Sequence, residues 1–398
     1  MKYILSPALL LFLLPCFSQD YSYMRYDVND GLAGSNVYCI TQDKEGFLWM
    51  GTEGGLSRFD GVHFTNFTLE DGLPDIEVLQ IMADSRERIW MGPFSQSVCY
   101  YYQGRIHNQE NDTLLKKIHI RSGILNFAED KEGNILINEV GVLHLVTTTG
   151  IVRDFDSIRG KPIYSYAVSK GSDGHFLVQD GDEVYRFDGK VFTHFFSIDF
   201  GSENSNFIVL RSQMFAWQGK EHAYRYRFAS LKLGKTFDFD AERNAMLHVS
   251  FSVVSDSTVY RNSTRGTREY NLFTGTVRDF SIGARISRTF RDDEGNLWFT
   301  SLGQGVFRLN SENIRNIKLM DKYSASWVPL TMRRIGDQLL VGGSNSMLYQ
   351  CSLSSPEHFT LRELKHSGEA NEIRYLAKMK DGRLLVGSSM RLFYENEV

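Results

Sequence analysis

Two short acidic segments are the first residues of this sequence that point to chemistry. They read Asp43-Lys44-Glu45-Gly46 and Asp292-Asp293-Glu294-Gly295-Asn296. Carboxylate oxygens are good ligands for Ca²⁺, but an EF-hand loop also needs oxygen ligands at alternate positions and a Glu at position twelve. Neither segment supplies that pattern, and each lies between two expected strands. We therefore expect solvated β-turns here and no metal site.

No motif of the sequence predicts catalysis or a cofactor. Its 10 His lack the HxxxH and HExxH spacings of zinc sites, and there is no GxSxG elbow. Outside the N-terminal leader, the cysteines are Cys39, Cys99 and Cys351, without a CxxC or metal-like spacing. We expect these three to be small buried residues. A fold alone does not exclude an enzyme, so catalysis stays an alternative.

Aromatic side chains are the remaining candidates for a ligand surface. Trp49, Trp90 and Trp298 recur at one position of an apolar segment, which predicts a role in the core. Trp327 lies outside that frame, beside Ser324-Ala325-Ser326. Tyr101 is the middle residue of a Tyr triplet, and alternation along a strand turns at least one of its three rings outward. Trp327 and Tyr101 are therefore the candidate ligand-binding residues.

The apolar segment around Trp49 belongs to a repeat that runs along nearly the whole chain. VYCITQDKEGFLWMGTEGGLSRFDG begins at Val37, and SRTFRDDEGNLWFTSLGQGVFRLN begins at Ser287. Further copies centre on Trp90, Leu136, Leu177, Trp217, Leu340 and Leu385, and one more is expected near Val259. The mean spacing is about 42 residues, which is typical of one four-stranded propeller blade.

Each unit has the same internal order. An apolar strand leads to a polar turn, and Gly46 ends that turn because a positive φ costs glycine little; Gly295 holds the same place in a later copy. The nearly continuous apolar strand around Trp49 that follows suits burial on both faces. An alternating strand, an Asp60-Gly61 hairpin and an outer strand complete the unit. We expect a structural role for Gly46 and Gly295, as for the three tryptophans.

These patterns predict an all-β protein of four-stranded antiparallel blades. We expect residues 20–317 to form a seven-bladed β-propeller, closed by an outer strand from Tyr23–Tyr26, and residues 318–398 to begin a second, incomplete propeller. Copies within roughly residues 200–280 lack the turn motif, so their blades are inferred from spacing. The alternative is a single ring of eight or nine blades.

The N-terminus and the overall charge bear on location and partners. Lys2, the apolar run Ile4–Phe17 and the polar Ser18-Gln19 form a pattern typical of a secretory signal peptide, which we place at residues 1–19. That run is too short to span a membrane, and no later run is long enough. The formal net charge of -4 offers no basic stripe for nucleic acid. We expect an exported protein.

The sequence from Asp30 to Pro74, DGLAGSNVYCITQDKEGFLWMGTEGGLSRFDGVHFTNFTLEDGLP, closely resembles the two-component-regulator propeller family. The family core Asp-x-x-Gly-x-Leu-Trp-x-Gly-Thr is complete at 43–52, and Ser301 replaces the Thr in a later copy. The resemblance implies the periplasmic sensor portion of a one-piece or hybrid two-component system. Such sensors carry two seven-bladed propellers, a β-sandwich, a membrane span and usually a histidine kinase. Their ligands are often oligosaccharides.

The resemblance therefore implies a ligand-sensing or interaction module without catalysis of its own, in the outer part of an inner-membrane receptor. The sequence stops at Val398 without a sandwich, span or output domain, so we expect a fragment or a truncated gene product. The expected partners are a periplasmic ligand, with an oligosaccharide as the implied class, and further propellers through self-association. The alternatives are a secreted lyase or glycan-active propeller enzyme, and a free-standing periplasmic binding protein.

Overall fold

The computed structural model describes residues 20–197, 214–218, 225–230, 235–240, 250–255, 257–309, 311–312, 315–316, 328–353, 359–364, 372–388 and 392–395. The chain divides into a compact unit Tyr23–Glu312 and a second unit that contains Asn313–Val398 and Met1–Ser22. The predicted signal peptide and Trp327 lie outside the described residues. The predicted domain boundaries at residues 20 and 318 stay predictions.

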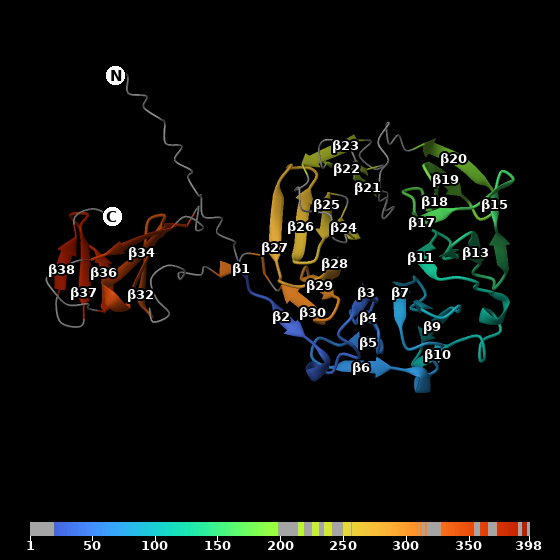
Figure 1. The fold of residues 1–398 in the computed structure, drawn as a ribbon, viewed down its shortest axis with the longest axis horizontal. Helices are drawn as coiled ribbons and strands as arrows, with labels where there is room; N and C mark the ends of the chain where they lie inside the picture. Colours follow the sequence, from blue (N-terminus) through green and yellow to red (C-terminus); the bar gives the residue numbers. More distant parts are fainter. Residues whose placement is uncertain are drawn as a thin grey trace, which may run out of the picture. The chain divides into compact units, whose positions relative to one another are not determined.

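The unit Tyr23–Glu312 is built from antiparallel sheets, and its first four sheets each contain four strands that follow one another in sequence (Figure 1). Their strands are β3 (Val37–Gln42), β4 (Leu48–Thr52), β5 (Gly55–Phe59), β6 (Phe64–Phe67); β7 (Val78–Ala83), β8 (Ile89–Pro93), β9 (Cys99–Tyr102), β10 (Arg105–His107); β11 (Ile124–Glu129), β12 (Ile135–Glu139), β13 (Val142–Val146), β14 (Val152–Phe155); β17 (Ser165–Lys170), β18 (Phe176–Asp180), β19 (Glu183–Phe187) and β20 (Phe192–Ser197). Short elements between them are η1 (Val28–Asp30), η2 (Leu69–Asp71), η3 (Leu115–Lys117), β15 (Ser157–Ile158) and β16 (Lys161–Pro162).

Three further sheets of this unit follow. They contain β21 (Met214–Gln218), β22 (Arg225–Ser230), β23 (Lys235–Asp240); β24 (Ser250–Ser255), β25 (Thr258–Asn262), β26 (Gly266–Asn271), β27 (Val277–Ser281); β28 (Ile286–Arg291), β29 (Leu297–Ser301), β30 (Val306–Leu309) and β2 (Met24–Tyr26). Val259, where spacing alone predicts a copy of the repeat, lies in β25. Within its described residues, this unit therefore has six four-stranded blade sheets and one three-stranded sheet.

The sheets lie around a central axis, and the two ends of the unit meet in one sheet (Figure 1). β2 pairs antiparallel with β30, with Met24 opposite Arg308 and Tyr26 opposite Val306. The innermost strand β28 contacts β3, which in turn contacts β7. The prediction that residues 23–26 supply an outer strand that closes the ring is confirmed.

The hydrophobic core lies between neighbouring blades. Every residue of β4 is buried, as the continuous apolar run predicts. Trp298 packs with Leu48 and Met50 of the next blade, while Trp49 packs with Ile89 and Met91 of the blade after that. The blades are thus joined by interlocking apolar side chains.

The second unit contains sheets of the same kind. Its strands are β32 (Pro329–Ile335), β33 (Gln338–Gly343), β34 (Met347–Ser352), β35 (Phe359–Glu363), then β36 (Ile373–Lys378), β37 (Leu384–Ser388), β38 (Leu392–Glu395), and a separate pair β1 (Asp20–Tyr21) and β31 (Arg315–Asn316), with η4 (Ser344–Ser346) before β34. Leu340 and Leu348 of the first sheet pack with Ile373 and Leu384 of the second. The chain is all-β, a propeller followed by the start of a second one.

Candidate functional site

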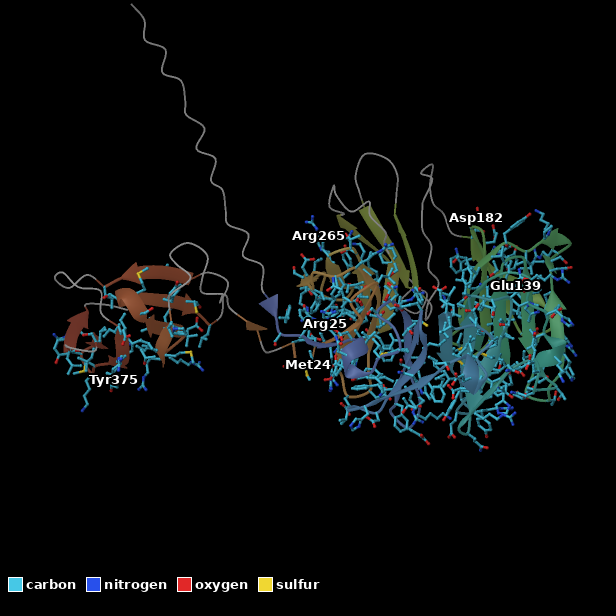
Figure 2. The ribbon with its side chains drawn as sticks, turned by 60° about the horizontal axis from the view of Figure 1, so that its bottom comes forward. Met24, Arg25, Glu139, Asp182, Arg265 and Tyr375 are labelled. Carbon is cyan, nitrogen blue, oxygen red and sulfur yellow. The ribbon has the colours of Figure 1, made fainter. Side chains whose placement is uncertain are left out.

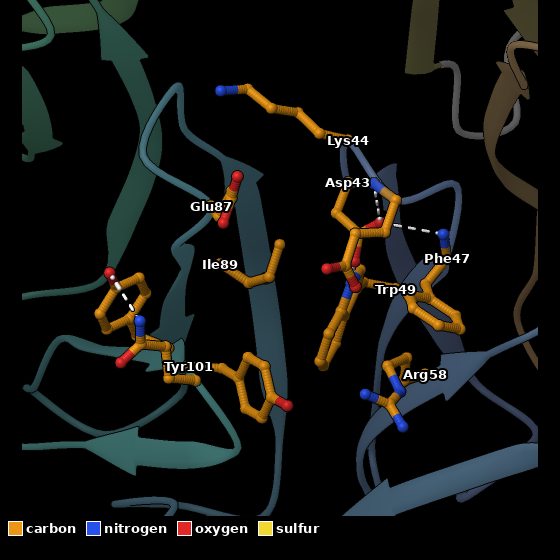
Figure 3. A pocket seen from close by; sticks show the side chains of 11 residues that line it. Asp43, Lys44, Phe47, Trp49, Arg58, Glu87, Ile89 and Tyr101 are labelled. Carbon is orange, nitrogen blue, oxygen red and sulfur yellow. Dashed lines mark hydrogen bonds between the residues drawn. The ribbon is translucent and has the colours of Figure 1, made fainter.

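A pocket lies between the sheet β3–β6 and the sheet β7–β10 (Figure 3). Its walls come from the turns that follow β3, β7 and β9 and from the strands β4, β5, β8 and β9. The cavity volume is about 130 Å³. Pockets for drug-sized ligands are typically ~300–1,000 Å³, and a cavity of about 150 Å³ holds benzene. This pocket therefore has room for one small ring and not for a whole oligosaccharide.

Tyr101, one of the two predicted ligand-binding residues, lines this pocket from β9. Its ring is half-buried and lies 4.7 Å from the ring of Trp49 and 5.2 Å from that of Phe67, measured between centroids. Neighbouring Tyr100 is buried, so alternation along β9 turns Tyr101 to the other face of the sheet. The role of Trp327 stays a prediction, because that residue is outside the described part of the chain.

Arg58 reaches the same pocket from β5. Its guanidinium lies 4.8 Å from the centroid of Phe47 and 5.8 Å from that of Trp49, which is cation–π geometry. Within the described residues, no carboxylate lies within 4 Å of this guanidinium, and no side-chain hydrogen bond holds it. The guanidinium can therefore still bind an anion.

The opposite end of the pocket carries acidic residues and one lysine (Figure 3). Lys44 donates a hydrogen bond to the carbonyl oxygen of Ser85, which holds its ammonium group across the gap between the two blades. Glu45 and Glu87 are exposed. Glu87 has φ +66°, a left-handed conformation that costs a non-glycine residue roughly 1–2 kcal/mol. This is the turn position that Gly46 occupies in the preceding blade, with φ +92°.

An aspartate beneath each tryptophan was missed by the sequence analysis. The indole Nε1 of Trp49 donates to Asp43 Oδ2 at 2.6 Å, Trp90 to Asp84 at 2.8 Å, and Trp298 to Asp292 at 2.7 Å. The other carboxylate oxygen of each aspartate accepts backbone N–H groups of the turn. The predicted turn at 292–296 is exposed at Asp293 and Glu294, but Asp292 is only 8% exposed, so the expectation of a solvated turn is wrong for that residue. Asp84, at the same place in the second blade, is only 4% exposed. The constant spacing of six residues between Asp and Trp was the available signal.

The three tryptophans offer no ring to a ligand. Trp49 and Trp298 are 1% exposed and Trp90 is fully buried. Their N–H groups have partners, and their rings lie in the interblade core. Gly295 has φ +88°, like Gly46 at the same turn position, and no atom lies within 4 Å of the place where its Cβ would be. The backbone conformation, and not close packing, favours glycine there.

His144 lies between two carboxylates, and it is closed to solvent. Its Nε2 lies 2.8 Å from Glu139 and its Nδ1 2.7 Å from Asp154. Glu139, labelled in Figure 2, also accepts the backbone N–H of Arg121 at 2.7 Å. Because the exposure of His144 is 1%, a substrate has no access to this ring. The described ranges contain no group of three potential metal ligands.

The cysteines are buried, as expected from the sequence. Cys39, Cys99 and Cys351 are all free thiols. Burial raises the pKa of Cys99 and of Cys351, which keeps both as neutral thiols at physiological pH. A buried thiol held in its protonated form is a poor nucleophile.

The comparisons with known proteins agree with this fold. Residues 31–54 match the family model described as two component regulator propeller. No curated protein matches the sequence. The extracellular domain of a hybrid two-component system from B. thetaiotaomicron has a TM-score of 0.70 at 15% identity, over 94% of this chain and 53% of that one. The chain thus spans about half the length of that structure.

Two other solved structures share the fold at lower similarity. PorZ, a surface component of the type-IX secretion system of Porphyromonas gingivalis, has a TM-score of 0.53 at 11% identity, over 94% of this chain and 52% of that one. A catalytically inactive virginiamycin B lyase from Staphylococcus aureus, solved with quinupristin, has a TM-score of 0.56 at 13% identity. The match covers 73% of this chain and 99% of that one. Helices that could cross a membrane are absent from the described residues. Residues 31–54 thus carry the two-component-regulator propeller repeat, and the chain as a whole shares the propeller fold of these structures.

Proposed function

We propose that this chain is the ligand-sensing or interaction module of a two-component receptor, with no catalysis of its own. The observation that carries the proposal is the fit to the extracellular domain of a hybrid two-component system, which extends through the ring into the second unit. The family repeat at residues 31–54 supports the same assignment. In this reading the module faces the periplasm, as the outer part of an inner-membrane receptor, and its kinase output lies outside this chain.

The pocket between the first two blades supports binding more than turnover. Tyr101 and Arg58 offer a ring face and a cation, which can hold a ligand. The lining residues are acidic, basic, aromatic and amide side chains and one isoleucine, with no Ser, Thr, Cys or His among them. Oligosaccharides remain the proposed ligand class, and this pocket is large enough for one sugar ring of such a ligand.

Thermal denaturation of the full chain with a panel of oligosaccharides tests the sensing function. A ligand that binds only the folded state raises the melting temperature, and the stabilisation grows with the logarithm of its concentration above Kd. We expect such a shift in melting temperature. We also expect chromatography to show that the oligosaccharide stays intact during hours of incubation with the chain. Turnover would overturn the proposal, and so would a panel without any shift.

A test in cells addresses the link to a receptor. An antibody raised against residues 20–197 should detect a membrane-bound polypeptide much larger than 45.6 kDa, the mass of this chain. A soluble periplasmic band of the mass of this chain would instead favour a free-standing binding protein.

A lyase is the second candidate, because this chain covers 99% of a virginiamycin B lyase. The buried His144 gives it no support, since a substrate has no access to this ring. Incubation of the chain with quinupristin separates the two functions. We expect the antibiotic to stay intact, and its opening by the chain would favour the lyase.

A further inference from the structure

The pocket beside Tyr101 holds an arginine that differs from its counterparts in the same molecule. Five arginines of the described residues lie over aromatic rings, namely Arg58, Arg88, Arg278, Arg308 and Arg383. All but Arg58 also have a carboxylate within 4 Å. The pairs are Arg88 with Asp84, Arg278 with Glu269, Arg308 with Glu294, and Arg383 with Asp381. Arg58 is the exception within the described ranges. A half-buried guanidinium without an anionic partner is the group expected where a ligand supplies the anion.

Arg308 shows what Arg58 would look like with a protein partner. Arg58 stands opposite Trp49 in the pairing of β4 with β5, and Arg308 stands opposite Trp298 in the pairing of β29 with β30. Arg308 lies 5.3 Å from its tryptophan and 3.7 Å from Glu294 of the preceding turn. The corresponding turn residue in the first blade is Glu45, which makes no such ion pair.

A second polar group without a partner lies at the same end of the pocket. The hydroxyl of Tyr101 makes no hydrogen bond within the described part of the chain, although the ring is half-buried. Figure 3 shows this hydroxyl and the guanidinium of Arg58 pointing toward each other across the pocket. A ligand oxygen between them would accept from both groups, and the ring of Tyr101 would lie along the face of the ligand.

The cavity and its rim limit the ligand further. A volume of about 130 Å³, close to that of a cavity that holds benzene, leaves room for a single six-membered ring and not for two. The acidic Glu45 and Glu87 stand at the other end, so a second negative charge on the ligand would be repelled.

We propose that this pocket binds a six-membered ring that carries a single carboxylate. The carboxylate receives the fork of Arg58 and the hydroxyl of Tyr101, and the ring packs against the ring of Tyr101. The proposal deepens the sensing function and rests on it, since it names the chemical class recognised at one site. The same chemistry occurs in a uronic acid and in an aromatic carboxylate.

Isothermal titration of the full chain with D-glucuronate, benzoate and D-glucose tests the proposal. We expect one of the two carboxylates to bind and the uncharged sugar not to bind. The variant Arg58→Gln should weaken that binding about 10- to 100-fold, because it removes a charge-assisted pair. Tyr101→Phe should weaken it about 5-fold, because it removes one hydrogen bond and keeps the ring. Arg308→Gln, the matched change in the blade that closes the ring, should leave the affinity unchanged.

The carboxylate that binds more tightly identifies the source of the ligand. A preference for glucuronate indicates a sugar, and a preference for benzoate indicates an aromatic metabolite. Equal affinity of parent and Arg58→Gln would overturn the site, provided that the melting temperature shows both to be folded. Failure of both carboxylates to bind at tens of millimolar would overturn it as well. If an oligosaccharide stabilises the parent and Arg58→Gln equally, sensing stands and only this pocket is wrongly assigned.

Discussion

At the level of single side chains, each repeat tryptophan is paired with a carboxylate six residues earlier. Burying an indole N–H without an acceptor costs roughly 1–3 kcal/mol, and the aspartate of the turn supplies that acceptor. The same aspartate holds the backbone of the turn, so one residue joins the turn to the core. Asp292 does this for Trp298 and for the N–H of Asn296.

The variant Asp292→Ala should lower the free energy of unfolding by about 2–4 kcal/mol, because it leaves Trp298 Nε1 and two turn groups without their acceptor. Asp293→Ala, one residue along, is the matched control. Asp293 is exposed and its side chain holds no buried group, so we expect a change within about 0.5 kcal/mol. Urea denaturation measures both variants. Similar losses in the two would contradict the role of Asp292.

The carboxyl group of Glu312 contributes to the way the free energy of unfolding of the propeller changes in acid. Burial raises its pKa, but hydrogen bonds and charge from Arg291 and Arg278 lower it more, so the pKa falls below its ordinary value of 4.5. A carboxyl whose pKa is lower when folded than when unfolded stabilises the fold above its unfolded pKa. That stabilisation is lost as pH falls through the folded pKa.

Glu312→Gln should therefore lower the free energy of unfolding at pH 7 by about 1–3 kcal/mol, since it removes two charge-assisted contacts. The loss should shrink as pH falls below about 4.5, the unfolded pKa, and vanish below the lower folded pKa, where Glu312 of the folded parent is protonated as well. Glu110→Gln, an exposed site with the same charge change, is the control. A Glu312→Gln deficit that does not depend on pH between 7 and 3 would contradict this assignment.

At the level of elements, the turn between the first two strands of each blade needs a left-handed residue. Gly46, Gly133, Gly174 and Gly295 fill this position with φ between +81° and +92°. Glu87 fills it in the second blade at a cost in backbone strain. The hairpin geometry of the blade thus imposes a positive φ at this position, and glycine occupies it in four of these five turns.

Exchanging residue types at this turn should have effects of opposite direction. Gly46→Ala should cost about 1 kcal/mol, because a Cβ there meets nothing closer than 3.9 Å and only the positive φ is unfavourable. Glu87→Gly should cost nothing and gain up to about 1 kcal/mol, the relief of strain being partly offset by the freer unfolded chain. Thermal denaturation of both variants gives the comparison. A loss above about 1 kcal/mol for Glu87→Gly would show that its side chain stabilises the fold.

At the scale of the whole propeller, stability depends on how the ring is closed. β2 joins residues of the N-terminal end to β30, and Tyr26 stacks on Trp298 at 5.9 Å and lies 5.1 Å from Phe59 of the next blade. Arg25, labelled with Met24 in Figure 2, donates to the carbonyl of Gln304 at 3.0 Å. Gly303 and Gly305 both donate to the carbonyl of Ser35, which ties this closing sheet to the first blade.

Gly305→Ala and Gly303→Ala form a matched pair that tests the closure. Both glycines have positive φ, +75° and +96°, so both variants should lose about 1 kcal/mol from backbone strain. Only at Gly305 would the Cβ meet backbone, the Tyr26 carbonyl oxygen at 2.2 Å, while nothing lies within 4 Å at Gly303. We expect Gly305→Ala to lose about 1–3 kcal/mol more, measured by urea denaturation. Equal losses would contradict the close approach of β2 to this turn.

The repeat explains which features could be predicted from the sequence. The unit around Trp49 predicted the strands β3 to β6 and the turn at Gly46, because hairpin chemistry and apolar alternation are properties of neighbouring residues. The closing strand near Tyr26 followed from its place before the first complete unit. The buried Asp84 and Asp292 did not follow, since a polar turn has the same composition whether its carboxylate points to water or to an indole.

By itself the sequence determined the class of fold, the period of the repeat and the likeness to the two-component-regulator propellers. These depend on local patterns, and a repeat of about 42 residues states the same pattern many times. The tertiary structure alone decided that Arg58, among the residues that the structure describes, lacks the carboxylate partner found at Arg308, and that Tyr101 lies across the pocket from it. Ion pairing and cavities arise where two blades meet, between residues whose distance in sequence says nothing about their distance in space.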